Sequence, residues 1–146
     1  RHPGNWNTAL ENIEYIRTEV PKSCNVPVLA FAICTVSTFN VFYLPEIIAE
    51  FARLKLDWFL NLVTQPDYYD MKHIPDPVKA KVIEKLLTIK DQTEITPIIN
   101  ILKTPSNPEV WGEFKFWTHE KDDYRGEAFK NTFPEFYEII TTYDLL

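Results

Sequence analysis

The sequence predicts an α/β protein whose carboxyl-terminal part is helical. Two short runs, residues 27–37 and 58–64, have the length and apolar character of buried strands. A segment with helical periodicity separates them, and this order favours parallel strands joined by a right-handed crossover. Beyond residue 76, the remaining segments have helical patterns only.

The size and charge of the chain limit what it could bind. Its 146 residues suit one domain, and 45% of them are hydrophobic, which is enough to build a core. The net charge of −6 argues against a broad grip on nucleic-acid phosphates and against a basic membrane-surface helix. No apolar run approaches the roughly 20 residues that a membrane span needs.

The first predicted element is an amphipathic helix over residues 5–19. Apolar residues recur in this segment at helical spacing. Asn5 or Asn7 would accept hydrogen bonds from the free N–H groups at its start, and Pro21 would end it.

The strand over 27–37 is apolar on both of its faces, so we expect helices to cover it from both sides. The next helix is expected to begin at Pro45, because proline is pre-organised for the first helical turn. Glu46 suits the positive end of that helix. The second strand, over 58–64, is closed by Pro66.

Proline also marks the start of each later helix. We expect these helices to begin at Asp76-Pro77, Thr96-Pro97, Asn107-Pro108 and Phe133-Pro134. The helix from Pro108 should turn Val110, Phe114 and Trp117 toward the core, because these residues recur at helical spacing.

Two parallel strands alone leave both edges of their sheet unpaired. We therefore expect either further strands within the chain or strands from a partner. The favoured partner is a second copy, in a homodimer whose sheets or helices cover each other.

The two cysteines indicate a reduced, cytoplasmic protein. Cys24 and Cys34 are ten residues apart and form no CxxC motif. Cys34 lies in an apolar strand, which is typical of a small buried side chain. The chain begins at Arg1 rather than Met, which suggests a fragment, a processed chain or a trimmed form.

Few catalytic patterns are present. The sequence contains no GxGxxG, GxxxxGK[ST], HExxH or GxSxG pattern. His2, His73 and His119 are far apart in the chain, so a three-histidine metal site is a disfavoured interpretation.

Two segments gather polar side chains that could act on a ligand. Residues 118–126, THEKDDYRG, place Asp122 and Asp123 near Arg125, and paired carboxylates suit a small hydrolase or a metal protein. A solvated acidic helix end is the favoured alternative. Residues 66–70, PDYYD, form either an aromatic platform for a base or sugar or, as we favour, a tyrosine pair that seals the end of the sheet.

The ordered set of motifs resembles one known family. GNWNTALENIEYI precedes a strand that ends in CTVSTFNVFYLPEIIAEF, a second strand follows in WFLNLVTQPDYYDMKHIP, and the tail contains EFKFWTHEKDDYRGEAFKNTFPEF. This order is similar to the second half of the twitch-type radical S-adenosylmethionine (radical SAM) proteins of phages and marine bacteria. The resemblance covers residues 4–137 and is most specific over 35–75.

The resemblance implies half of a TIM-like barrel. Residues 1–75 would form a βα-barrel fragment, and residues 76–146 a helical carboxyl-terminal part of the same domain. The intact family uses S-adenosylmethionine and a [4Fe–4S] cluster, but the CxxxCxxC motif that holds the cluster is absent from this sequence.

The missing motif decides what the resemblance implies about function. The chain is expected to be a fragment of a radical SAM-like protein that is inactive alone and lacks an N-terminal half. The alternative is a complete small interaction or ligand-binding module that kept the fold without the cluster.

The resemblance also implies a set of cofactor-facing residues. Strand ends face S-adenosylmethionine in the family, and ligands generally lie at the carboxyl ends of parallel strands. Carried over by position, the candidates are Thr35, Ser37, Asn40, Asn61 and Gln65. Ordinary strand, turn and cap roles are the favoured alternative for these residues.

Overall fold

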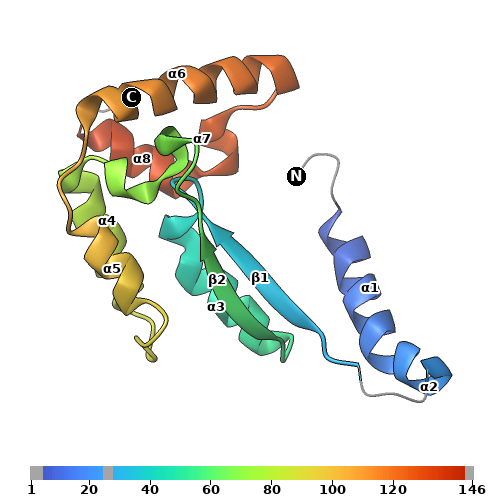
Figure 1. Cartoon of the computed structure of the whole chain (residues 1–146). Coiled ribbons are helices and arrows are strands. Elements are labelled where there is room, and N and C mark those ends of the chain that lie inside the picture. Colours follow the sequence, from blue (N-terminus) through green and yellow to red (C-terminus); the bar gives the residue numbers. More distant parts are fainter. Residues whose placement is uncertain (1–4, 25–27, 144–146) are drawn as a thin grey trace.

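The computed structural model describes residues 5–24 and 28–143 and consists mostly of helices around one small parallel sheet (Figure 1). The chain begins with α1 (Trp6–Thr18) and α2 (Val20–Cys24). A β–α–β unit follows: β1 (Phe31–Val36), the 3₁₀ turn η1 (Val41–Tyr43), α3 (Leu44–Arg53) and β2 (Asp57–Leu62). The later elements are the 3₁₀ turns η2 (Asp67–Tyr69) and η3 (Met71–His73) and the helices α4 (Asp76–Leu86), α5 (Thr96–Leu102), α6 (Pro108–Arg125), α7 (Phe129–Thr132) and α8 (Pro134–Thr142).

β1 and β2 lie parallel and in register, as the helical connection between them requires. Val36 faces Leu62, and the Val63 N–H donates to the Val36 carbonyl oxygen at 2.9 Å. The predicted α/β class and the parallel pair are therefore confirmed. Both strands are shorter than the segments 27–37 and 58–64, the first of which begins at a residue outside the described part of the chain.

Within residues 5–24 and 28–143, helices cover one face of the sheet and leave the other open. On the covered face Cys34 is buried, and the Phe51 ring of α3 lies 6.5 Å from the Trp58 ring of β2. On the other face Phe31 and Ile33 are 57% and 54% exposed. The expectation of helices on both faces was wrong, because the later helices gather beside α3 and beyond the carboxyl ends of the strands (Figure 1).

One hydrophobic core joins the sheet to these later helices. Its fully enclosed side chains include Val36, Leu44, Ile74, Val82, Leu86, Phe114, Phe136 and Ile140. Because they come from β1, α3, α4, α6 and α8, the carboxyl ends of the strands are held firmly against the helical part.

The helices predicted from proline are confirmed at α3, α4, α5, α6 and α8, each with a proline in its first turn. α6, however, faces the core differently from the prediction. Trp111, Phe114 and Thr118 are buried, whereas Trp117 is 41% exposed. Both sets of residues fit the helical period, and the stacking of Trp111 on Phe114 at 4.6 Å favours the second orientation.

α1 lies apart from the main body, beside β1 and α3 (Figure 1). None of its residues is buried, and Trp6 is 53% exposed. Asn5 caps the helix as predicted, since its side chain accepts from the Asn7 N–H at 2.9 Å. Arg17 connects α1 to the body by donating to the Leu54 carbonyl oxygen at 2.5 Å. The predicted helix is confirmed. It ends at Thr18, however, and Pro21 lies in the first turn of α2 instead of ending α1, because proline is tolerated at the start of a helix.

Cys34 is buried, as predicted, and Cys24 is exposed; both thiols are free. Burial raises the pKa of the Cys34 thiol, so this residue is a small protonated apolar side chain. Among the described residues, no helix has both the length and the hydrophobicity that crossing a membrane requires.

Candidate ligand pocket at the carboxyl ends of the strands

The turn after β1 is shaped by Asn40. The Ser37 N–H donates to Asn40 Oδ1 at 2.8 Å, and Asn40 Nδ2 donates to the Thr35 carbonyl oxygen at 2.9 Å. A short amide side chain is well suited to such local bonds. The turn brings the Phe39 ring to α6, where it lies 5.1 Å from the Phe114 ring.

The segment after β2 meets this turn. The Gln65-Pro66 peptide bond is cis, and η2 follows it directly. The Thr38 N–H donates to the Tyr69 carbonyl oxygen at 2.9 Å, which ties the two strand ends together. As a result, the rings of Phe39 and Tyr69 lie 5.3 Å apart.

Phe39 and Tyr69 border a cavity of about 350 Å³, which we call the aromatic pocket. Two further rings line it, those of Phe129 and Phe133, whose centroids lie 6.0 and 5.8 Å from that of Phe39. The size suits a small organic molecule. Its position, beyond the carboxyl ends of parallel strands, is the usual place for a ligand in an α/β fold.

Lys121 and Arg125 bring positive charge to the aromatic pocket from the last turns of α6. The Lys121 ammonium donates to the Tyr69 hydroxyl and lies 4.6 Å from the centroid of that ring. It also lies 5.5 Å from the Tyr68 ring. Because an ammonium has three donors, Lys121 keeps capacity for a further acceptor.

Thr118 lines the same pocket and is 6% exposed. Its hydroxyl makes no hydrogen bond to any other residue that the structure describes. A buried polar group in this condition costs about 1–3 kcal/mol, and native proteins pair the large majority of such groups. A buried and unpaired hydroxyl on a residue that lines a cavity is a candidate partner for a polar atom of a bound molecule.

Asp122 positions the far wall of the aromatic pocket. Gly126, in the left-handed conformation with φ of 64°, ends α6 and reverses the chain. Asp122 Oδ2 then accepts from the Phe129 N–H at 2.5 Å, which holds the start of α7. The carboxylate is thus engaged in structure, and Glu127 is the second acid that lines the pocket.

Two of the predicted cofactor-facing residues lie on the open face of the sheet. Thr35 and Asn61 are register partners there, and both are exposed. Thr35 also borders a groove beside α1, together with Asn40. Neither Thr35 nor Asn61 lines the aromatic pocket.

The other candidates bond within their own turns. Ser37 Oγ accepts from the Phe39 N–H at 3.3 Å, and Gln65 Nε2 donates to Asp67 Oδ1 at 2.5 Å. With Asn40, they occupy the turn and cap roles named as the alternative. Their contact with a cofactor stays a prediction.

Of the residues that make the aromatic pocket, the sequence pointed to Tyr69, in the segment PDYYD, but not to Phe39, Phe129, Phe133 or Thr118. Thr118 and Lys121 lie in the segment 118–126, in which the sequence analysis considered the acidic residues as candidates and not these two. Of those acids, Asp123 lies at the surface, with its Oδ2 3.7 Å from His119 Nε2. The signal available for Phe39 was its place directly after a strand end.

A metal site receives no support from the described side chains. Among the described residues, no group of three or more His, Cys, Asp and Glu side chains could hold an ion. His73 and His119 lie on different elements, η3 and α6, and His2 is outside the described residues.

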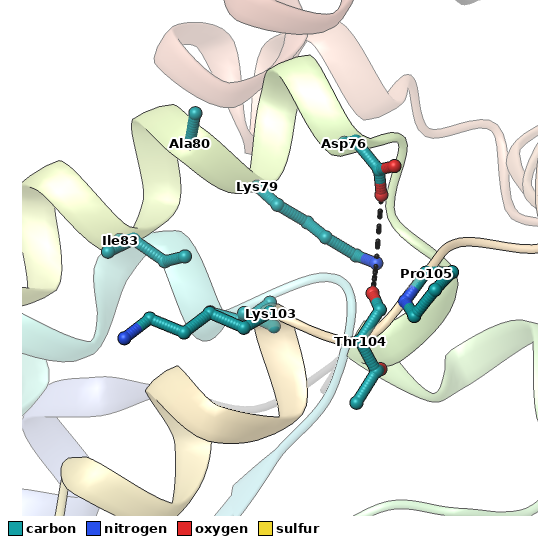
Figure 2. A pocket seen from close by; sticks show the side chains of 8 residues that line it. Asp76, Lys79, Ala80, Ile83, Lys103, Thr104 and Pro105 are labelled. Carbon is teal, nitrogen blue, oxygen red and sulfur yellow. Dashed lines mark hydrogen bonds and ion pairs between the residues drawn. The ribbon is translucent and has the colours of Figure 1, made fainter.

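A second cavity, of about 260 Å³, lies between α4 and the segment after α5, and we call it the clasp pocket (Figure 2). The Lys79 ammonium donates to the Thr104 carbonyl oxygen at 2.6 Å and to Asp76 Oδ1 at 3.2 Å. The same Asp76 oxygen accepts from the Ser106 N–H at 3.3 Å. The Lys79 side chain is 3% exposed, so a buried cation joins two helical segments.

Comparisons with known proteins identify no relative: no protein-family model, no curated protein and no solved structure matches the chain.

Proposed function

We propose that the chain is a ligand-binding module and that the aromatic pocket holds a small organic acid with one planar ring. The Thr118 hydroxyl carries this proposal, because it is buried at the pocket without a partner. A ligand atom that accepts from this hydroxyl, or donates to it, would remove the cost of leaving it unpaired.

The walls favour a planar ring. The side chains of Phe39, Tyr69, Phe129 and Phe133 line the cavity. Aromatic groups attract one another in tilted and offset arrangements at centroid distances of about 4.5–7 Å. The protein's own rings already lie at such distances, so a ligand ring would extend an existing cluster.

The cations favour an acidic group on the ligand. Lys121 retains donor capacity, and the Arg125 guanidinium has the planar fork that matches a carboxylate or phosphate. The carboxyl-terminal end of α6 disfavours an anion by about 0.3–1 kcal/mol. Asp122 and Glu127 also line the pocket, and Asp122 already accepts from the Phe129 N–H. The preference for an acidic group therefore rests on direct contact of the ligand with Lys121 and Arg125.

Four probes test the proposal: indole-3-acetate, phenyl phosphate, the neutral indole-3-ethanol and the non-planar cyclohexane carboxylate. Amide chemical shifts in a ¹H–¹⁵N spectrum report where each probe binds. We expect the two planar acids to shift the amides of Thr118, Lys121 and Phe129, and the other two to bind more weakly. Failure of both planar acids to shift these amides at millimolar concentration would contradict the proposal.

Variants make the test specific. Thr118→Val and Lys121→Met should each weaken binding of the planar acids about tenfold, which corresponds to one lost charged or buried hydrogen bond. Lys103→Met, in the clasp pocket, removes an equal charge elsewhere and should leave binding unchanged.

A second candidate function is that of a fragment of a radical SAM-like protein, inactive alone. The parallel β1–α3–β2 unit supports it, because such units repeat in TIM-like barrels. Half of a barrel with a helical carboxyl-terminal part is the corresponding fold, and S-adenosylmethionine and the [4Fe–4S] cluster would belong to the intact protein. An in-frame CxxxCxxC upstream of Arg1 in the gene would support this candidate, and calorimetry with S-adenosylmethionine would test the pocket assignment directly.

The homodimer is likewise a proposal. The uncovered face of the sheet, with Phe31 and Ile33 more than half exposed, supports it. Sedimentation that shows a stable monomer at micromolar concentration would contradict it.

A further inference from the structure

We propose a second binding site, on the outer edge of β1, which accepts an extended basic polypeptide segment as an added strand. This site is separate from the aromatic pocket and does not depend on the function proposed for it. The outer edge is the one that faces away from β2, toward α1.

Alternation along β1 determines which main-chain groups are free. The Val36 carbonyl oxygen accepts from the Val63 N–H, so Val36 and Cys34 direct their main-chain groups toward β2. Intervening residues direct theirs the opposite way. The N–H and C=O groups of Phe31 and Ile33 therefore point outward, and within the described residues no hydrogen bond engages them there.

Asn40 sets the limit of this free edge. Its Nδ2 donates to the Thr35 carbonyl oxygen, the next outward acceptor along β1, at 2.9 Å. That bond takes the position that an added strand would otherwise occupy. An added strand would therefore pair with residues 31–35, through the two groups of Phe31, the two of Ile33 and the Thr35 N–H.

A groove runs along the same edge. It encloses about 820 Å³ and is bordered by β1, by α3 and by Trp6 of α1. Ile33, Ile47 and Phe51 give it apolar walls. In strand addition, main-chain bonds supply affinity while alternate side chains enter such a groove.

The charged residues that border the groove are both acidic, Glu46 and Glu50. Glu46 pairs with Lys85 at 2.6 Å. Glu50 accepts from Arg53 through both oxygens, at 2.7 Å each, and also from the Trp6 side chain. A carboxylate has about four lone-pair sites, so each of the two can accept from a further donor. They favour Lys or Arg on the incoming strand. A second copy of this chain fits less well, because its net charge is −6 and the residues of β1, FAICTV, include no cation.

The decisive variant is Ile33→Pro. Proline lacks an N–H and is tolerated on the outer edge of a sheet. Because the Ile33 N–H points away from β2, the substitution should keep the β1–β2 ladder and the unfolding midpoint. Cys34→Pro, one residue on, removes an N–H that faces β2 and should destabilise the protein.

Peptides selected from a displayed library of random eight-residue segments provide the ligand. We expect the selected peptides to alternate apolar residues with Lys or Arg, and to lose affinity about tenfold on Ile33→Pro. N-methylation of those peptide residues that face β1 should abolish binding, whereas N-methylation of the alternate residues should not. Glu46→Gln combined with Glu50→Gln should weaken binding and reduce its salt dependence.

Three results of the binding experiments would overturn the proposal, and a fourth comes from sedimentation. The first is that the library yields no peptide that binds. The second is that the selected peptides bind Ile33→Pro as tightly as the unsubstituted protein, while both proteins have the same unfolding midpoint. The third is that the two N-methylated series of peptides bind equally. Sedimentation decides the remaining case, since a dimer that Ile33→Pro abolishes would assign the edge to a second copy and overturn the basic peptide.

Discussion

The clasp pocket and the aromatic pocket are both cavities bordered by a lysine, yet their polar groups are in different states. In the clasp pocket, Lys79 is buried and bonded to Thr104 and Asp76. In the aromatic pocket, Lys121 has the Tyr69 hydroxyl, but Thr118 is buried without a partner.

This difference separates a cavity that is part of the architecture from one that suits a ligand. The bonds of Lys79 connect the start of α4 to the segment after α5, and a ligand there would have to compete with them (Figure 2). The aromatic pocket offers rings, donor capacity on Lys121 and a hydroxyl whose bonding is incomplete. A polar group therefore indicates a binding site best when it is both buried and unmatched beside open volume.

The largest expected effect on stability is at the clasp. Lys79→Met should lower the free energy of unfolding by about 2–3 kcal/mol, because the Thr104 carbonyl oxygen loses a charged hydrogen bond. Lys103→Met, at the exposed side of the same cavity, should change it by no more than about 0.5 kcal/mol. Urea unfolding of both variants measures the difference. Equal effects would show that the Lys79 bonds do not stabilise the contact between α4 and the segment after α5.

A substitution at Thr118 is expected to increase the stability of the protein. Thr118→Val replaces an unpaired hydroxyl with a methyl group of similar shape and should raise the free energy of unfolding by about 1 kcal/mol. The same variant should weaken ligand binding. A loss of stability in urea unfolding would mean that the hydroxyl is already satisfied and that the two pockets do not differ in the way described.

His73 sharpens the comparison because its two ring nitrogens are also buried without partners, yet it borders neither pocket. Burial, and then the charge of Lys72, lower the pKa of His73, against the opposing effects of Asp70 and Asp67. The folded state therefore binds a proton at His73 less readily than the unfolded state does. Because the unfolded state takes up the proton first, stability present above about pH 6.5 should be lost as the pH falls through the lowered pKa.

Urea midpoints between about pH 7.5 and pH 5.5 measure this loss. His73→Gln should flatten the profile over that range without changing binding in the aromatic pocket. An unchanged slope in this variant would assign the pH dependence to other groups.

The smallest effect on stability is expected at Lys121. Lys121 lines the aromatic pocket but is only partly buried, so Lys121→Met should change the free energy of unfolding by at most about 0.5 kcal/mol. Binding of a planar acid should nevertheless fall. Thermal unfolding gives the change in stability, and titration of the same preparation gives the change in affinity. A large loss of stability would show that Lys121 has a structural role like that of Lys79.

The backbone plan was predictable because its signals are local. Proline placed five helices correctly, and the two apolar runs gave the parallel strands. The facing of α6 was not predictable, because the sets containing Trp111 and Trp117 both fit a helical period. Only packing against Phe114 distinguishes them.

The position of the candidate site was predictable from the sequence, but most of the residues that line it were not. The general rule for parallel strands pointed to the residues after β1 and β2, and Phe39 and Tyr69 do lie there. The polar side chains named in advance bond within their own turns instead, as Asn40 and Gln65 show. Thr118 lies in a helix, 79 residues after Phe39 in the sequence. No local sequence pattern indicates that these two residues line the same pocket.

Asn40 links the two proposed sites through one side chain. Its amide shapes the turn that presents Phe39 to one site, and it occupies the last outward carbonyl of β1 at the other. A substitution at this position would alter the turn beside the proposed ligand pocket and, in the same step, free the Thr35 carbonyl oxygen at the proposed strand-addition edge. Selection for solubility and selection for ligand recognition would then act on the same side chain.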